Sequence, residues 1–173
     1  KNILPLQLGY SSSGEVVQTG KGVSDFHTGD RVVSNGNHAE YVVVNQNLCT
    51  RIPDNTDIKE ASFTVLGSIA LHGLRLSETS LGSKVVVIGL GIIGQLVCRL
   101  AEAQGSEVIG IDPDTKRTDM SANFYTSVEE ANMTNVDSVI ITAATSSNEP
   151  IEVATKIARN KAKIVVVGDI PLN

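Results

Sequence analysis

Tryptophan is absent from this chain of 173 residues, and aromatic residues together make up only 3% of it. The two cysteines, Cys49 and Cys98, form no C-x-x-C pattern, so we expect two reduced packing thiols in the cytoplasm. No basic run occurs and the net charge is −5, which argues against nucleic acid or an anionic membrane surface as a partner. No apolar stretch reaches the roughly 18 residues needed to span a bilayer. We also expect no signal peptide before the first strand.

An apolar strand pattern runs directly into the spacing G-x-G-x-x-G at residues 84–94. Residues 85–88 form the continuous apolar run typical of a parallel strand that is buried on both faces. After the glycines, apolar residues recur with the period of one helix face. Strand, turn and helix thus follow in the order in which this spacing predicts dinucleotide binding. The positions of that helix face are Ile93, Leu96, Val97, Leu100 and Ala101.

Each glycine of this turn has a predicted role. Gly89 permits the tight turn, Gly91 lets a pyrophosphate approach the backbone, and Gly94 lets the helix pack close to the strand. The N–H groups at the helix start then face the phosphates. The alternative is a glycine-rich packing turn with an incidental acid after it. The residues whose backbone we expect to hold the cofactor are Gly89, Leu90, Gly91, Ile92, Ile93 and Gly94.

Asp112 follows the next apolar run, about 20 residues beyond the glycines. A carboxylate there can accept both hydroxyls of an adenosine ribose. Such a charge-assisted hydrogen bond contributes about 1.5–3 kcal/mol, whereas the 2′-phosphate of NADP would meet a like charge. The sequence therefore predicts NAD(H) in preference to NADP(H).

The first third of the chain has a different pattern. Short β-branched runs at residues 15–18, 30–33 and 40–44, separated by turn signals, predict a small all-β unit over residues 1–56. Asp57 and Glu60 have capping-box spacing and predict a helix that buries Ala61, Val65 and Ile69. This helix links the two parts and opens a second domain, residues 57–173. The absence of an initiator Met suggests a piece of a larger protein.

The second domain is predicted to be an α/β Rossmann coenzyme domain with a parallel, doubly wound sheet. Further strands are expected at residues 124–126, 138–141 and 163–167, and Pro150 should open a helix that carries Ile151, Ala154, Ile157 and Ala158 on one side. The chain then ends directly after strand five. A parallel crossover needs a dozen or more residues, yet residues 113–123 have hardly any apolar periodicity. Either that helix is vestigial or, as we favour, residues are absent near Arg117 and Thr118.

Several segments resemble the medium-chain dehydrogenase/reductase superfamily, the relatives of zinc-type alcohol dehydrogenases. Residues 29–32, 38–41 and 48–53 are similar to its GroES-like catalytic domain, and residues 89–112 to its coenzyme fold. Residues 34–40, 64–71 and 142–150 resemble a zinc-less bacterial subgroup. In that subgroup the module is often fused to a glucose-fructose oxidoreductase/inositol dehydrogenase type module, in gene clusters for cell-surface polysaccharides.

The resemblance implies an NAD(H)-dependent oxidoreductase that acts on a sugar or sugar-nucleotide alcohol or ketone, with a homodimer or a fused second module as partner. It also implies further cofactor contacts. Arg117 resembles the basic residue that flanks the adenosine ribose. Thr142 and Ala143, after strand four, and Gly168, after strand five, lie where the nicotinamide would rest. For Gly168, a plain turn at the end of a strand is an equal expectation.

The zinc site of that family is not matched. Where zinc enzymes carry Gly-His-Glu, this chain has Gly9, Tyr10 and Ser11, and the position of a ligand cysteine, around Leu66 and Gly67, is apolar. Residues 34–37 leave no room for a four-cysteine lobe. A zinc site needs three or four converging ligands, and the histidines are scattered, so we expect no zinc. The three histidines are His27, His38 and His72.

No catalytic residue is assigned. Tyr10 and Ser11 could donate hydroxyls toward a substrate, and His38 could act as a general acid or base. The more ordinary interpretations are a packed strand residue, a turn residue and a solvated loop imidazole. We expect structural roles for His72, Glu40 and Glu60. Two alternatives stay open: a catalytically inactive nucleotide-binding module that serves a fused or partner enzyme, and a purely structural fragment.

Overall fold

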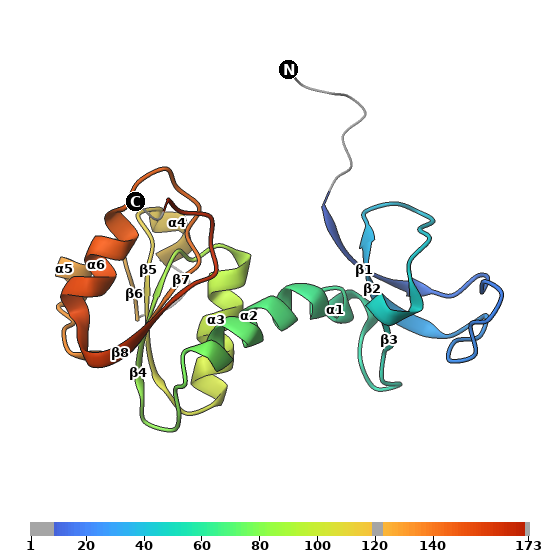
Figure 1. Ribbon diagram of the computed structural model, residues 1–173, viewed down its shortest axis with the longest axis horizontal. Coiled ribbons are helices and arrows are strands. Elements are labelled where there is room, and N and C mark those ends of the chain that lie inside the picture. Colours follow the sequence, from blue (N-terminus) through green and yellow to red (C-terminus); the bar gives the residue numbers. More distant parts are fainter. Residues whose placement is uncertain (1–8, 119–122, 172–173) are drawn as a thin grey trace, which may run out of the picture. The chain divides into compact units, whose positions relative to one another are not determined.

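The computed structural model describes residues 9–118 and 123–171 (Figure 1). The chain forms two compact units, Lys1–Leu66 and Gly67–Asn173. Among the helices of the described residues, none is both long enough and apolar enough to cross a membrane.

The first unit contains a three-stranded antiparallel sheet in the order β1-β2-β3. Its strands are β1 (Tyr10–Glu15), β2 (Arg31–Asn37) and β3 (Cys49–Arg51), and a short 3₁₀ helix, η1 (Gln46–Leu48), leads into β3. Its buried apolar core is small, consisting of Val33, Ile52 and Ala61 with Ile58 packed against them.

Two of the strand predictions for this unit are wrong. Residues 40–44 are irregular despite their β-branched run, and the Val43 side chain is fully exposed. A strand needs a neighbour to bond its backbone, and no strand in the described part of the chain pairs with this segment. The first strand ends at Glu15, where the sequence pattern had it begin, because its register with β2 runs from Tyr10 to Glu15.

The linking helix consists of two pieces, α1 (Ile58–Ala61) and α2 (Thr64–Leu76). The predicted cap is confirmed, since the Asp57 carboxylate accepts the N–H groups of Lys59 and Glu60 at 2.7 and 3.3 Å. The expected helix face is only partly confirmed. Ala61 is buried, whereas Val65 and Ile69 are half-buried, and α2 buries Ala70, Gly73 and Leu74 instead.

The second unit is built on a five-stranded sheet in the order β6-β5-β4-β7-β8, and every neighbouring pair is parallel. Figure 1 shows the sheet with helices packed along it. This order and the crossover helices confirm the predicted doubly wound fold. The strands are β4 (Lys84–Ile88), β5 (Glu107–Ile111), β6 (Phe124–Tyr125), β7 (Val136–Ile141) and β8 (Ala158–Val166). The helices are α3 (Ile92–Ala103), α4 (Thr115–Thr118), α5 (Val128–Ala131) and α6 (Glu149–Ile157).

The central strand β4 is buried on both faces, as its continuous apolar run predicted. Val85 and Val87 pack with α2 and α3 on one side, and Val86 and Ile88 pack with α6 on the other. Such a strand holds its carboxyl end in a fixed position between two layers of helices. The turn that follows β4 is therefore attached to a strand that is buried on both faces.

The described part of the crossover from β5 to β6 contains one helical turn, α4. The sequence left open whether residues are absent from the stretch 113–123. Within that stretch, residues 119–122 lie outside the described residues. Ala158, expected on the face of the helix that Pro150 opens, begins β8 instead, because α6 ends at Ile157 and the chain passes directly into the strand.

Both cysteines are free thiols. Cys98 is buried in α3, and burial, assisted by the nearby Glu102 carboxylate, raises its pKa to about 12. Burial also raises the pKa of the half-buried Cys49. Cys98 therefore has the protonated, inert character of a packing residue.

We expect Asp137→Asn to lower the free energy of unfolding by about 1–2 kcal/mol at neutral pH. The Asp137 carboxylate accepts the Lys84 N–H at 2.7 Å and Arg159 Nε at 2.6 Å, which ties the amino ends of β4 and β7 to the start of β8. These bonds, the one from Lys84 foremost, lower the pKa of Asp137. Urea denaturation of both proteins measures the difference.

Because the pKa of Asp137 is lowered in the folded protein, its stabilising effect is present above the usual carboxyl range and is lost as the pH falls through the lowered value. The gap between the two proteins should accordingly close in acid. Asp169→Asn, at an exposed carboxylate of the same unit, is the control and should leave stability unchanged. A gap that persists unchanged in acid would contradict this account.

Candidate functional site

The glycine turn lies between β4 and α3, and the surroundings of its three glycines explain why they are needed. Gly89 has φ +98°, and a Cβ there would stand 2.6 Å from the Ala143 nitrogen. A Cβ on Gly94 would stand 1.9 Å from the Gly89 oxygen, so the helix can approach the strand only with glycine here. A Cβ on Gly91 would meet nothing within 4 Å among the described residues. Gly91 therefore borders open space, while the other two glycines serve packing.

The first turn of α3 is suited to an anion. Gly91 is its N-cap and provides no side-chain hydrogen bond to the N–H groups that follow. Unbonded N–H groups and the positive end of the helix dipole attract phosphate. The open space at Gly91 lies against this turn, so the residues present fit the pyrophosphate of a dinucleotide.

The Asp112 carboxylate is almost fully buried at the end of β5 and holds the glycine turn in place. It accepts the Leu90 N–H at 2.7 Å, the Asp114 N–H at 2.9 Å and Arg117 Nη1 at 3.1 Å. Burial opposes ionisation of this carboxyl, but the three hydrogen bonds outweigh it and lower the pKa of Asp112. The Leu90 N–H is thus engaged by a carboxylate, and the next N–H groups along the turn are those that face open space.

Arg117 lies beside Asp112, the residue expected to hold the adenosine ribose. Its guanidinium also reaches Asp114, with Nε 3.5 Å from Oδ2, and the side chain is about half exposed. A carboxylate offers about four acceptor positions. Three are used at Asp112, so one position and the movable Arg117 remain for the hydroxyls of a ribose.

The loop after β7 packs directly on the glycine turn. Thr142 Oγ1 donates to the Gly89 carbonyl at 2.6 Å, and the Ala143 N–H donates to the Ile88 carbonyl at 3.1 Å. A Cβ on Gly168 would stand 2.0 Å from the Ala143 oxygen. Gly168 is therefore required by the close approach of the loops after β7 and β8, a role that neither expectation for this residue included.

The strand order brings these segments to one edge of the sheet. β4 and β7 are neighbours, and their connections leave toward opposite sides, which makes the gap beyond their carboxyl ends the switch point at which doubly wound sheets bind ligands. One contributor was not found from the sequence: Gln95 Nε2 donates to the Leu90 carbonyl at 2.9 Å and braces the turn. No sequence signal marks it, since its spacing from Leu90 belongs to no motif.

In the first unit, the three candidate catalytic residues have different surroundings. Ser11 is buried at a bulge in β1 with φ +88°, and its hydroxyl donates to the Ser62 carbonyl. Tyr10 is 50% exposed, so it is not the packed strand residue of the ordinary interpretation. His38 lies in a bend after β2, exposed, and its ring stands 3.0 Å from where a Cβ on Gly9 would be. Gly9, Tyr10 and His38 therefore lie close together, while the Ser11 hydroxyl is already engaged.

No metal-binding group is assembled in residues 9–118 and 123–171: nowhere do three His, Cys, Asp or Glu side chains come together. His72 is exposed on α2, and His27 lies in a loop of the first unit. Glu40 and Glu60 are exposed.

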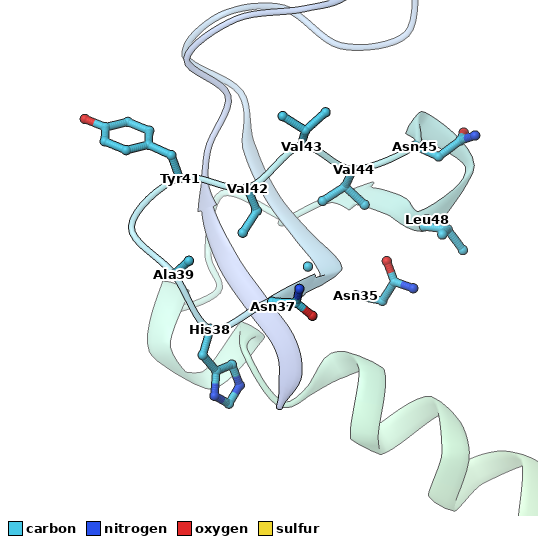
Figure 2. Close-up of a pocket in the computed structure, with 11 residues that line it drawn as sticks. Asn35, Asn37, His38, Ala39, Tyr41, Val42, Val43, Val44, Asn45 and Leu48 are labelled. Atoms are coloured by element: carbon cyan, nitrogen blue, oxygen red, sulfur yellow. The ribbon is translucent and has the colours of Figure 1, made fainter. Parts of the chain in front are cut away.

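A cavity of about 610 Å³ opens at the end of β2, within the first unit (Figure 2). Asn35, Asn37 and Asn45 contribute its carboxamides, and His38 lies at its border. Residues 41–44, which were expected to be part of a strand, form the opposite wall.

Two family models match the chain. The alcohol dehydrogenase GroES-like domain matches residues 1–54. The NAD binding domain of D-isomer specific 2-hydroxyacid dehydrogenases matches residues 63–168, more than half of the chain. The second match describes the dinucleotide-binding unit, and the first describes what precedes it.

Individual relatives are dehydrogenases. D-guloside 3-dehydrogenase of Escherichia coli (strain K12) is 35% identical over 119 residues, which cover 66% of this chain and 34% of that protein. (R,R)-butanediol dehydrogenase of Bacillus subtilis (strain 168) is 25% identical over 181 residues, covering 88% of this chain and 52% of that protein. Among solved structures, CAD from Helicobacter pylori complexed with NADP(H) has a TM-score of 0.81 at 20% identity, covering 99% of this chain and 62% of that one.

The chain spans between about a third and a half of the length of these two curated relatives. The alignment with the butanediol dehydrogenase extends over 181 residues, more than the 173 of this chain, so that enzyme has residues within the matched span that lack a counterpart here. The likeness to CAD shows the fold.

We expect Gly91→Ala to weaken NADH binding about tenfold or more while leaving stability unchanged. The backbone of Gly91, with φ −64° and ψ −174°, suits alanine, and the added methyl group would project into the space proposed for the pyrophosphate. Gly94→Ala is the contrasting variant. Its methyl group collides with the Gly89 carbonyl and should cost about 1–3 kcal/mol of stability.

Fluorescence titration with NADH and urea denaturation of both variants separate the two effects. Equal NADH affinity for Gly91→Ala and the unchanged protein would show that the open space beside Gly91 is not the phosphate site.

Proposed function

Because the chain belongs to the medium-chain dehydrogenase/reductase superfamily, the relatives of zinc-type alcohol dehydrogenases, we propose that it is part of an NAD(H)-dependent, zinc-independent oxidoreductase for a sugar or sugar-nucleotide alcohol or ketone. We place its action in the cytoplasm. The names of the two curated relatives refer to a guloside and a butanediol, which supports a hydroxylated alcohol or ketone as substrate.

One observation carries the cofactor assignment: the Asp112 carboxylate at the end of β5, bonded to the glycine turn after β4. When bound, NAD(H) supplies or accepts the hydride. The chain's own residues would hold it: N–H groups of the first turn of α3 would bind the pyrophosphate, and the remaining acceptor position of Asp112 would take a ribose hydroxyl. Thr142 keeps the turn in position through its bond to the Gly89 carbonyl.

The proposed preference for NAD(H) depends on the negative charge of Asp112. Asp112 is ionised at neutral pH because its pKa is lowered, and it would repel a 2′-phosphate. Arg117 could attract such a phosphate, but Asp112 and Asp114 already engage its guanidinium. The two carboxylates thus outweigh the charge of the Arg117 guanidinium, which both of them contact.

Zinc independence rests on the residues at positions 9–11, which lack the Gly-His-Glu of zinc enzymes. The proton that accompanies hydride transfer then needs another carrier. Tyr10 and His38 are the candidates, because both are exposed and both lie near Gly9. Ser11 is set aside, since its hydroxyl donates to the Ser62 carbonyl.

That engagement of Ser11 also favours the second candidate function, a nucleotide-binding module without chemistry that serves a fused or partner enzyme. A homodimer or a fused second oxidoreductase module stays a prediction. Turnover of NADH with a panel of ketoses and sugar nucleotides by the full-length protein distinguishes the two functions: an active protein is the oxidoreductase, whereas NADH binding without turnover indicates the module.

Separate titrations with NADH and NADPH test the cofactor preference, and NADH should bind more tightly. Asp112→Asn should weaken NADH binding about tenfold or more, because a charge-assisted bond to the ribose is lost. The same variant should bind NADPH better, since Arg117 is then released toward the 2′-phosphate. Tighter binding of NADPH by the unchanged protein would refute the assignment.

The control variant is Asp114→Asn, which removes an exposed neighbouring charge without touching the turn. It should keep most of the NADH affinity. Because Asp112 also bonds Leu90, urea denaturation of each variant must accompany the titrations, so that loss of folding is not taken for loss of binding.

Metal analysis of the purified protein tests zinc independence. We expect less than one tenth of a zinc ion per chain, and prolonged treatment with a chelator should change neither the thermal midpoint nor NADH affinity. About one zinc per chain would overturn this part of the proposal.

A further inference from the structure

The cavity at the end of β2 combines features of a binding site that the cofactor does not use. It is open to solvent and has a volume of about 610 Å³, within the range of roughly 300–1,000 Å³ typical of small-molecule sites. Its residues all belong to the first unit, whereas the glycine turn and Asp112 belong to the second.

The polar groups of this cavity are side-chain amides. Asn35 and Asn37 both line the cavity from the end of β2, where the pairing of that strand with β1 shifts register. Within the described ranges, neither carboxamide has a hydrogen-bond partner, while Asn45 uses its oxygen to accept the Asn47 N–H at 3.1 Å. Figure 2 shows Asn35 and Asn37 near one another, with the ring of Tyr41 directed away. Two complete carboxamides are therefore available to a ligand.

The remaining wall of the cavity is apolar and lies close to β2. Val42, Val44 and Leu48 line it. A Cβ on Gly36 would stand 2.8 Å from Val42 Cγ2, so the glycine between Asn35 and Asn37 is what lets the valine lie this near the strand. Amides on one side and aliphatic groups on the other match a ring that carries hydroxyls on its edge and C–H groups on its face.

The lining also carries no fixed charge. Of the described residues around the cavity, none is Asp, Glu, Lys or Arg, and the only titratable groups are His38 and Tyr41. A carboxamide offers both donors and acceptors, as a hydroxyl does. A phosphate or carboxylate would find no cation here, and its desolvation would go uncompensated.

The position of the cavity relates it to the chemistry. Asn37 pairs with Tyr10 across the sheet, and His38 lies against Gly9. Residues 9–11 stand where zinc relatives carry their metal-binding Gly-His-Glu, so the cavity adjoins the position at which the resemblance places the reacting centre.

We infer that this cavity binds the uncharged, polyhydroxylated ring of the substrate through the carboxamides of Asn35 and Asn37, and that it selects neutral sugars over sugar phosphates. The inference rests on the proposed function and narrows its substrate class.

The test is titration of the full chain, saturated with NADH, with methyl β-D-glucopyranoside, glucose 6-phosphate and 2,3-butanediol, followed by amide NMR shifts and calorimetry. We expect the methyl glucoside to shift the resonances of residues 35–45 and to bind more tightly than the other two. Glucose 6-phosphate binding most tightly, or shifts confined to other residues, would overturn the inference.

Two near-isosteric variants test the role of the carboxamides directly. Asn35→Leu and Asn37→Leu should each weaken the glucoside about three- to tenfold, since each removes neutral hydrogen bonds. The matched control is Asn47→Leu, which changes an exposed asparagine outside the cavity and should have no effect. Circular dichroism of all three checks that β2 is intact. Unchanged affinity in both cavity variants would refute the role of the carboxamides.

A gain-of-function variant covers the case in which Leu disturbs the sheet. Asn35→Lys places a cation at the cavity and should raise affinity for glucose 6-phosphate several-fold relative to the glucoside; no gain would count against the inference. Failure of the proposed function looks different: NADH would not bind, while the glucoside still shifted residues 35–45. Sugar turnover with NADH that is indifferent to Asn35→Leu and Asn37→Leu would refute the cavity and leave the function standing.

Discussion

The hydrogen bond from the Leu90 N–H to the Asp112 carboxylate, 2.7 Å long, is the interaction on which the nucleotide site depends. It joins the turn after β4 to the end of β5, and it is possible because the two strands are parallel and in register, with Ile88 opposite Ile111. A buried carboxylate must be compensated, and the turn provides that compensation. The shape of the turn and the charge of the acid therefore stabilise each other before any cofactor binds.

The loops after β7 and β8 also pack against this end of the sheet. Thr142 bonds the glycine turn, and Gly168 lies close to Ala143. Gly89 and Gly168 both approach the backbone near Ala143 more closely than any side chain would allow. Packing thus explains Gly89, Gly94 and Gly168, whereas Gly91 borders open space. A rigid frame around one open position is a preorganised site, in which little conformational entropy is lost when a ligand binds.

The first unit has the opposite character. Its core is small, residues 40–44 have no strand partner in the described part of the chain, and its cavity is lined by neutral amides and valines. The second unit concentrates charge, with Asp112, Asp114 and Arg117 in contact at one edge. The two units are accordingly suited to different parts of a reaction: charged groups and helix N–H groups for a nucleotide, and neutral groups for a sugar ring.

The sequence alone determined the features that depend on local order. The buried strands of the second unit, the glycine turn, the cap at Asp57 and the acid at Asp112 were all predicted, because each follows from the spacing of neighbouring residues. Only the tertiary structure decided the fate of residues 40–44, the engagement of the Ser11 hydroxyl by Ser62, the packing role of Gly168 and the grouping of Asn35 with Asn37 at a cavity. These outcomes depend on segments distant in the chain, since pairing and burial are set by the partner that folding brings alongside.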